Sequence, residues 1–447
     1  MPVEDKVQTL RSLVSLLSNA VEVISREWEI KDQNPEHRPF LPSADLHHAR
    51  QTIVGACGML MSLVQEPHHR LMETALQYYS SRALHVAVEA RLADILAEAD
   101  PELGMDSKTI SVRTGIPQHN LAQVLRPLCS MYIFKEIKPG YFANNETSGQ
   151  MVNDEPFRSW LLVHGLTIYT ASTKLPAVLF DTGKIQGRSS TRTAFQEALG
   201  TDLSFWEYLE QDTQPSDGTK KARREVDTFT LAMVGGGRVH STPLYADYPW
   251  ESLGDGTLVD VGAGVGGMSL DLAKQFPRLR FVLQDRPSVI SGAEAVWKRE
   301  LPHMISTNRV QFMAHDFFAD QPVKGASVYL MRYIMHDWPD EQCITILSKL
   351  RDIMGPHSRI LAVDQILHPT VGSAYLNPAP APLPPNYGHV QLLSHMRDLN
   401  MLALFNGMER TPEDFASLAE RAGLKMVKIW ECRSTMGIAE MRRNDAP

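Results

Sequence analysis

One histidine and two acidic residues in the C-terminal half of the chain have the types and the order of a proton-transfer site. His336 follows an expected strand, and a neutral imidazole is the usual general base near neutral pH. Asp364 ends the next expected strand, and Glu409 stands just before an expected helix. Because an acidic partner commonly holds a base in place, we interpret the two acids as the groups that orient His336. The alternative is a structural histidine that caps the helix beginning near Pro339.

A glycine-rich turn upstream of this histidine predicts a site for a nucleotide-like ligand. An apolar strand runs into four glycines and an expected helix follows, and glycine lets the backbone approach a ligand closely. Asp260 stands just before them, where a carboxylate repels a pyrophosphate but suits the ammonium group of S-adenosylmethionine (SAM). The pattern G-x-G-x-x-G leaves NAD or FAD as the alternative ligand. The glycines are Gly262, Gly264, Gly266 and Gly267.

Asp285 ends the second expected strand and supports a nucleoside ligand without choosing the cofactor. An acid at this place suits the ribose hydroxyls of SAM and of NAD alike. Two features favour SAM, namely Asp260 and the position of the motif after residue 250, since dinucleotide-binding domains often open a chain.

Strands and helices alternate from residue 256 onward, which predicts a doubly wound α/β sheet. Ligands of such sheets bind beyond the carboxyl ends of the strands, where the glycine turn and His336 would meet. The Pro-rich segment 368–390 interrupts the alternation, and we expect either an ordered excursion beside the site or a mobile loop without a role in the chemistry. The expected strands lie near 257–262, 279–284, 310–314, 326–331, 358–364, 426–432 and 435–441, and the main helices near 267–276, 288–298, 339–354 and 411–422.

The N-terminal half is expected to be helical. Apolar residues at helical spacing predict an amphipathic helix over 4–28, and further helices are expected near 43–64 and 68–80. The first two helices are interpreted either as a core helix or surface hairpin, or as a dimer interface. A winged helix is expected within 80–147, with helices over Ala83–Ala97, Ser107–Thr114 and Gln118–Met131, and a hairpin around Lys138-Pro139-Gly140. Residues 155–247 are expected to be mostly helical.

Composition argues against several classes of function. The net charge of −8 gives no basic field for nucleic acid, and Arg126 is the one full positive charge on the expected recognition helix, so a DNA-binding regulator is the weak alternative. The four cysteines lack C-x-x-C spacing, which argues against a disulfide framework and against a zinc site, and no metal is expected. No secretory signal and no apolar run of about 18 residues is present, so we expect a cytoplasmic protein without a membrane partner.

Several motifs together resemble the small-molecule O-methyltransferases of the plant caffeic-acid and flavonoid type and of the fungal polyketide type. The glycine turn is followed, in order, by Asp316-Phe317, His336-Asp337-Trp338 and Glu409-Arg410-Thr411. The resemblance covers most of the chain and implies SAM as the cofactor, a Rossmann-like class I methyltransferase sheet, and an N-terminal all-α and winged-helix dimerisation domain. The domains that it implies are a helical dimerisation extension at 1–80, a winged-helix-like domain at 81–150, a helical connector lining the substrate pocket at 151–247 and the SAM-binding domain at 248–447.

The resemblance also implies roles for single residues. Asp285 would hold the ribose, Asp316 and Phe317 would bracket the adenine with Trp338 nearby, and His336 would be the base held by Asp364 and Glu409. The implied cofactor site comprises Asp260, Gly262, Gly264, Gly266, Asp285, Arg286, Asp316, Phe317, Arg332 and Trp338. The implied acceptor site comprises Phe229, Met233, Met335, Met401 and Met408. For Phe229, Met233 and Met401, plain core packing is the alternative.

The chain departs from the plant pattern in several places, and Met408 and the Pro-rich segment 368–390 alter the expected pocket wall. Arg332 replaces a usual lysine, and Asp364 replaces a usual glutamate and reaches one methylene less. The sequence therefore predicts methyl transfer from SAM to a hydroxyl of an aromatic or polyketide-like metabolite, by a homodimer that associates through its N-terminal helices. Some fungal proteins of the same fold bind SAM but catalyse dehydrations and pericyclic cyclisations, and a SAM-binding pericyclase is the alternative.

Overall fold

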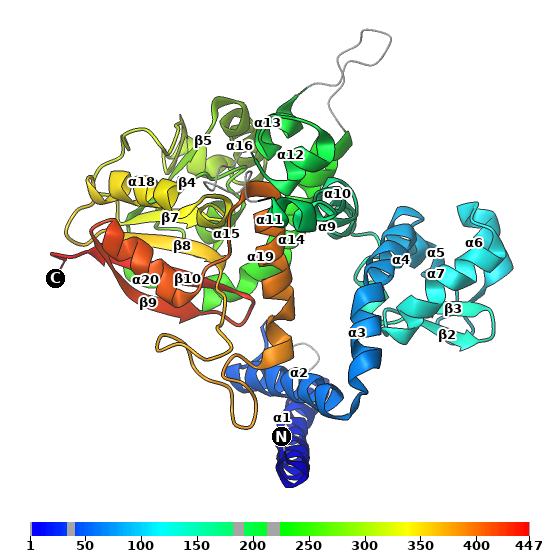
Figure 1. Ribbon diagram of the computed structural model, residues 1–447. Helices are drawn as coiled ribbons and strands as arrows, with labels where there is room; N and C mark the ends of the chain where they lie inside the picture. Colours follow the sequence, from blue (N-terminus) through cyan, green and yellow to red (C-terminus); the bar gives the residue numbers. More distant parts are fainter. Residues whose placement is uncertain (1, 34–40, 182–191, 212–223, 447) are drawn as a thin grey trace, which may run out of the picture. The chain divides into compact units, whose positions relative to one another are not determined.

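The computed structural model describes residues 2–33, 41–181, 192–211 and 224–446 (Figure 1). The chain forms two compact units. One unit contains Met1–Val64, Gln186–Thr193 and His240–Pro447, and the other contains Gln65–Ile185 and Ala194–Val239. The four-part domain division drawn from the sequence stays a prediction.

The first unit is built on a seven-stranded sheet of order β6-β5-β4-β7-β8-β10-β9. The strands from β6 to β8 are parallel, whereas β10 pairs antiparallel with both β8 and β9. The doubly wound α/β fold expected from the alternation is thus confirmed. The strands are β4 (Thr257–Val261), β5 (Arg280–Asp285), β6 (Val310–Ala314), β7 (Val328–Arg332), β8 (Arg359–Gln365), β9 (Leu424–Glu431) and β10 (Met436–Arg443).

Apolar cores cover both faces of this sheet, because its central strands are predominantly apolar on both sides. Neighbouring residues of β4 point to opposite faces, so Leu258 packs in one core and Val259 in the other. Trp297 belongs to the core of Leu258, while Ile346 and Phe415 belong to that of Val259. The helices of this region are α15 (Gly267–Gln275), α16 (Pro287–Glu300), α17 (Pro302–Ser306), α18 (Asp340–Arg351), α19 (Leu392–Phe405) and α20 (Pro412–Arg421).

The topology brings the two motifs of the expected site to adjacent strands. The chain runs outward from β4 to β6 and then returns to β7, which pairs with β4 in the register Asp260↔Leu330. The edge beyond such a reversal is where doubly wound sheets bind ligands. The glycine turn after β4 and the loop of His336 after β7 therefore leave the sheet side by side.

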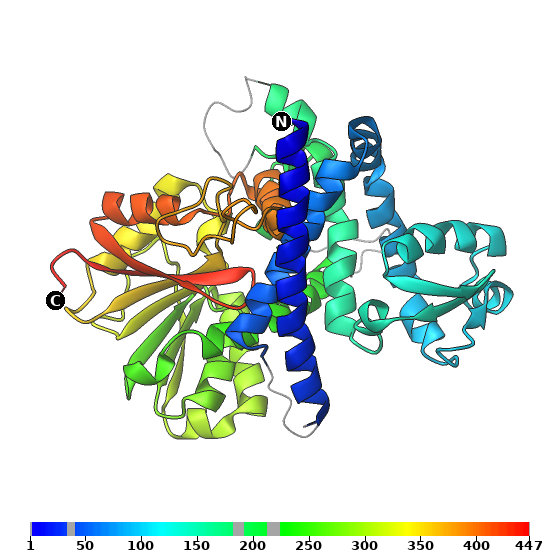
Figure 2. The same cartoon turned by 90° about the horizontal axis from the view of Figure 1, so that it is seen from below.

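The first two helices pack against each other and against the Pro-rich segment. α1 (Val3–Gln33) is one long helix, dark blue in Figure 2, and is followed by α2 (Ala44–Val64). Leu13 and Ala56 are fully buried with Leu383 and Tyr387 in one apolar cluster. Segment 368–390 is therefore ordered and anchored on the N-terminal helices.

The second unit contains the expected winged helix, with two corrections. Its three-stranded sheet has the order β1-β3-β2, and α6 and α7 match the helices predicted at Ser107–Thr114 and Gln118–Met131. The helix predicted over 68–80 ends at Leu76. Its elements are α3 (Pro67–Leu76), α4 (Tyr78–Glu89), α5 (Leu92–Leu96), β1 (Met105–Asp106), α6 (Ser107–Thr114), α7 (Gln118–Ser130), β2 (Phe134–Lys138), β3 (Tyr141–Asn144) and α8 (Glu146–Gly149).

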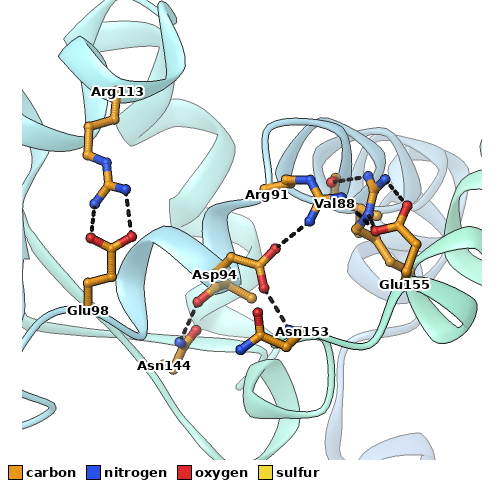
Figure 3. A network of polar contacts seen from close by, with 10 residues as sticks. Val88, Arg91, Asp94, Glu98, Arg113, Asn144, Asn153 and Glu155 are labelled. Atoms are coloured by element: carbon orange, nitrogen blue, oxygen red, sulfur yellow. Dashed lines mark hydrogen bonds and ion pairs between the residues drawn. The ribbon is translucent and has the colours of Figure 1, made fainter.

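The single helix predicted over Ala83–Ala97 is wrong, because the chain breaks it at Arg91. Arg91 adopts the left-handed conformation with φ of 53°, which ends α4 and starts α5. Figure 3 shows its guanidinium between two acids, 3.2 Å from Asp94 and 2.6 Å from Glu155. These ion pairs accompany the break, and the sequence alone gives no sign of them.

The rest of the second unit confirms the helical character predicted for 155–247. The helices are α9 (Glu155–Gly165), α10 (Thr167–Ser172), α11 (Leu175–Phe180), α12 (Ala194–Leu199), α13 (Phe205–Glu210) and α14 (Arg224–Ala246), which continues into the first unit. Within the described part of the chain, no helix combines the length and apolar character of a membrane span. Nor do the described residues gather three or more histidine, cysteine or acidic side chains around a possible metal position, and all four cysteines are free.

Candidate active site

His336 lies on a short turn directly after β7 and contacts two acids. This turn, η2 (Met335–Asp337), buries the imidazole to 6% exposure. Nδ1 lies 3.1 Å from Oε1 of Glu409, and Nε2 lies 3.4 Å from Oδ1 of Asp337. Because a carboxylate can only accept, Nδ1 is the donor to Glu409. The neutral ring then carries its lone pair on Nε2, which is the nitrogen able to accept a proton.

Arg410 fixes the turn that carries His336. Its buried guanidinium donates to the carbonyl oxygens of Met335 at 2.5 Å and Trp338 at 2.8 Å, and to Asp340 at 2.9 Å. A charged donor shared by two carbonyls of one turn restrains the backbone on both sides of the histidine. The sequence placed Arg410 in a motif but gave it no role, although its position next to Glu409 was the available signal.

The segment before Glu409 approaches the same turn through its backbone. The amide of Met408 donates to the carbonyl of His336 at 3.0 Å. A Cβ on Gly407 would lie 2.1 Å from that carbonyl oxygen, so only glycine allows this approach. The histidine and its glutamate are thus held together by main-chain contacts as well as by their side chains.

Asp364, predicted to share the orienting role, makes no hydrogen bond to the ring. Its carboxylate is buried at the end of β8, and neither oxygen has a hydrogen-bond partner among the described residues. It acts on His336 through its charge alone. An aspartate is one methylene shorter than the glutamate of the plant pattern, which agrees with the absence of a hydrogen bond between Asp364 and the ring of His336.

The acids and the imidazole strongly shift one another's pKa values. Burial lowers the pKa of His336, but the charges of Glu409, Asp337 and Asp364 outweigh it and raise that pKa to about 9. Burial raises the pKa of Asp337 to about 6 and that of Asp364 to about 7, against the opposing pull of His336. A cluster whose groups titrate around neutrality is suited to proton transfer.

Of the four glycines in the turn, Gly262 and Gly266 are packed against side chains, whereas Gly264 and Gly267 face open space. A Cβ on Gly264, where φ is 58°, would meet no heavy atom within 4 Å, so the turn presents bare backbone to open space there. A Cβ on Gly266, where φ is 74°, would lie 2.1 Å from Leu283. Gly266 therefore serves packing, while Gly264 offers a surface for a ligand.

Asp285 is fixed beside the open glycine. Its carboxylate accepts from the backbone amides of Gly264 and Arg286, each at 2.7 Å. Each oxygen keeps a free lone-pair direction, since a carboxylate accepts about four hydrogen bonds. This geometry fits a group that presents two neighbouring hydroxyls, such as a ribose.

Asp260 was expected to contact the ammonium group of SAM, but it is more deeply buried than such a contact requires. It is 3% exposed and accepts from the hydroxyl of Ser269 at 2.5 Å. Burial raises its pKa to about 6, opposed by Ser269 and by the charge of Arg332. The structure thus gives Asp260 a place under the glycine turn, where almost none of its surface is open to a ligand.

Three aromatic rings gather beyond β6 and β7. Phe317 and Phe318 each meet Trp338 edge to face, with ring centroids 5.9 and 4.8 Å apart. The exposed Asp316 accepts from the amide of Phe318 at 3.0 Å. The structure brings Asp316, Phe317 and Trp338 together as predicted for an adenine site, and it adds Phe318, which was not predicted.

Comparison with known proteins identifies the family. A family model of the O-methyltransferase domain matches residues 191–425, and one of the O-methyltransferase dimerisation domain matches residues 72–154. The chain is 43% identical to the O-methyltransferase gedA of Aspergillus terreus, over 99% of this chain and 98% of that protein. It is 40% identical to the O-methyltransferase tpcA of Aspergillus fumigatus, over 98% and 96% respectively. The chain belongs to the O-methyltransferase family.

Solved structures agree with this assignment. The Mitomycin 7-O-methyltransferase MmcR superposes with a TM-score of 0.65 at 25% identity, over 84% of this chain and 97% of that one. LepI in complex with SAM has a TM-score of 0.70 at 20% identity, over 95% and 100%, which is a likeness of fold. This O-methyltransferase is thus a SAM-dependent protein, and the fit of Gly264, Asp285 and the aromatic rings to SAM agrees with that.

The methionines expected to line the acceptor pocket of this O-methyltransferase differ in exposure. Met335 is fully buried and packs in the core beside α18, and Met401 is buried as well, so for these two side chains the structure shows core packing. Met408 is half-buried, next to Glu409. Of these three methionines, Met408 is the one that is exposed enough to contact a ligand.

Phe229 and Met233 belong to the second unit of the O-methyltransferase. Phe229 meets the rings of Phe205 and Trp206 edge to face at 5.4 and 5.7 Å, so aromatic packing holds it. Met233 is 46% exposed on α14. Their predicted role as acceptor contacts stays a prediction.

Arg332 ends β7 among polar neighbours. Its guanidinium donates to the hydroxyl of Ser241 at 3.3 Å and lies 5.2 Å from the ring centroid of Tyr333. Its charge also acts on Asp260 under the glycine turn. Arg332 therefore stands between the glycine turn and the turn of His336, in accord with its predicted place in the cofactor site.

Proposed function

We propose that this O-methyltransferase acts on a hydroxyl group of an aromatic or polyketide-like metabolite, with His336 as the general base. The observation that carries the proposal is the contact of His336 Nδ1 with Glu409 at 3.1 Å, which leaves Nε2 as the proton acceptor. The relatives that share the whole chain are fungal O-methyltransferases, which supports transfer to oxygen.

The residues that would hold the cofactor follow from the geometry. The open backbone at Gly264 would face its amino-acid part, Asp285 would bind the ribose hydroxyls, and Phe317 with Trp338 would lie against the adenine. When bound, SAM supplies an electrophilic methyl group on a positively charged sulfonium.

The proton of the acceptor would pass from its hydroxyl to Nε2 of His336. In the free protein the ring holds a proton at neutral pH, since its pKa is raised to about 9. A positive charge bound nearby lowers the pKa of an imidazole and so favours the neutral ring. Asp337 touches Nε2 at 3.4 Å and would keep the proton that arrives there close to a negative charge.

The ratio of products tests this function against the pericyclase alternative. The purified protein is incubated with SAM and a panel of phenolic acceptors, and S-adenosylhomocysteine and product are quantified together. Methyl transfer requires one S-adenosylhomocysteine for each product. Product without S-adenosylhomocysteine would instead establish a SAM-binding cyclase or dehydratase.

We also propose that the homodimer, which the dimerisation-domain match supports, is extended along α1. Apolar side chains recur on α1 every seven residues and are exposed: Val7 at 40%, Val14 at 56%, Val21 at 46% and Trp28 at 59%. A seven-residue apolar stripe is the pattern by which helices pair. A different side of α1 carries Leu13, which is already buried.

Sedimentation or light scattering tests this surface. The double variant Val14→Glu and Val21→Glu is expected to dissociate or weaken the dimer, because each places a charge on the stripe. Asn19→Glu is the matched control, since Asn19 is exposed on α1 about 150° around the helix from Val21 and Val14. An unchanged mass for the double variant would rule α1 out as a dimer contact.

A further inference from the structure

A second cationic side chain reaches the carboxylate that holds His336. Arg397 lies on α19, and its Nε is 3.8 Å from Oε1 of Glu409, the same oxygen that His336 approaches at 3.1 Å. Glu409 is fully buried, and its other oxygen, Oε2, has no hydrogen-bond partner among the described residues. The arginine and the histidine thus share one oxygen of a carboxylate that water does not reach.

Arg397 also faces His336 through an aromatic ring. Its guanidinium carbon lies 5.5 Å from the ring centroid of Tyr333. The ring of Tyr333 is stacked on the imidazole of His336, with centroids 5.4 Å apart and an interplanar angle of 24°. The side chain of Arg397 is only 16% exposed, so its charge is poorly screened by solvent.

The charges around His336 show what Arg397 contributes. The titratable and charged groups around the pair of His336 and Glu409 are Asp337, Asp364, Asp398, Tyr333, Arg332, Arg397, His240 and Arg410. Asp398 accepts from the backbone amide of Glu409 at 2.8 Å. Asp337, Asp364 and Glu409 are the acids that favour the protonated ring. When the ring is neutral, the buried carboxylate of Glu409 still needs a positive neighbour.

We propose that Arg397 is a positioning residue that supplies the counter-charge to Glu409 and so makes the proton of His336 easier to remove. This proposal rests on the proposed function of His336 as the base. Arg397 contacts Glu409 and the ring of Tyr333, and no contact with the reacting atoms is assigned to it. It acts through Glu409, whose contact with Nδ1 sets both the orientation and the proton affinity of the ring.

The test compares Arg397→Gln, Arg397→Lys and a surface control, Arg299→Gln, across pH. Arg299 is 69% exposed in its side chain and pairs only with its sequence neighbour Glu300 among the ion pairs described. Removing the positive charge raises the pKa of His336, so the acidic limb of kcat/KM for Arg397→Gln moves up by about one pH unit. At pH 7 this variant is about tenfold slower, since one unit changes the neutral fraction tenfold. At high pH the rates converge, and Arg397→Lys restores most of the profile.

Two further measurements keep the outcomes separate. The affinity for S-adenosylhomocysteine stays unchanged in Arg397→Gln, whereas a misfolded site loses it. The titration of His336, followed by NMR of labelled histidine with His336→Gln as the assignment reference, reports the pKa without turnover. If His336 proves dispensable for turnover, the proposed base fails while the NMR shift still stands. An unmoved titration and a uniform loss of rate at every pH would overturn the role of Arg397.

Discussion

Replacing Glu409 with glutamine removes one negative charge from the buried cluster and leaves its shape almost unchanged. In the native protein the Oε1 atom lies 3.1 Å from Nδ1 of His336, and the side chain of Glu409 is 0% exposed. An opposite charge at this range is worth about 1–3 pKa units. The pKa of His336, raised to about 9 by the acids around it, is therefore expected to fall to about 6–8 in Glu409→Gln.

The kinetic signature follows from this shift. The acidic limb of kcat/KM moves down by the same about 1–3 pH units, and the plateau also falls about tenfold or more, because an amide holds the ring less firmly than a carboxylate. The assay records S-adenosylhomocysteine formation from pH 5.5 to pH 10. Glu341→Gln is the control, since Glu341 is 78% exposed on α18.

The direction in which the acidic limb of kcat/KM moves tests whether the charge of Glu409 acts on His336. Glu409→Gln and Arg397→Gln are predicted to move the acidic limb in opposite directions, because one removes a negative and the other a positive charge from the same contact. A limb that stays in place in Glu409→Gln, while the control behaves as wild type, would refute the coupling of Glu409 to His336.

Three further predictions concern stability and binding. Burial raises the pKa of Asp364 from its usual 3.8 to about 7, so this residue destabilises the fold progressively as the pH rises from about 4 to about 7, and fully above that. Asp364→Asn should therefore raise the melting temperature more at pH 8 than at pH 5, a difference that corresponds to on the order of 2 kcal/mol in unfolding free energy, and an equal effect at both pH values would contradict this. Arg410→Met removes a charged donor from two buried carbonyls and should cost about 3 kcal/mol in a denaturant titration as well as lower kcat; a variant as stable as wild type would show that the turn needs no such support. Gly264→Ala should weaken S-adenosylhomocysteine binding in calorimetry with a loss of only about 1 kcal/mol of stability, whereas Gly266→Ala should chiefly lower stability, because its Cβ meets Leu283; the reverse order would exchange their roles.

The α/β sheet was predictable from the sequence because each strand is a short apolar run bounded by turn residues. β6 at 310–314 agrees with the prediction to the residue, and the helices between the strands agree within a few residues. α19 (Leu392–Phe405) was missed, since it follows a Pro-rich segment and carries exposed leucines where an amphipathic pattern would place polar residues. The break at Arg91 was missed because nothing in the local sequence marks this residue for a positive φ, and one of its ion-pair partners, Glu155, is 64 residues away.

Some residues of the candidate site could likewise be predicted from the sequence, and others could not. His336 and Glu409 were recognisable because each stands at the end of a regular element, where doubly wound sheets carry their chemistry. Arg397 was not, because its contact with Glu409 depends on how α19 packs. Asp364 was recognised as a site residue, but it makes no hydrogen bond to the ring. That difference depends on the length of the side chain by one methylene, which a sequence pattern does not resolve.

The central claim is that His336 removes the acceptor's proton in a SAM-dependent methyl transfer. The most direct measurement compares His336→Ala with the control His357→Ala, an exposed histidine, for turnover and for S-adenosylhomocysteine affinity in the same preparation. His336→Ala is expected to lose about 10²–10⁴-fold in kcat and to keep its affinity for S-adenosylhomocysteine. Turnover of His336→Ala at the rate of the control would contradict this claim.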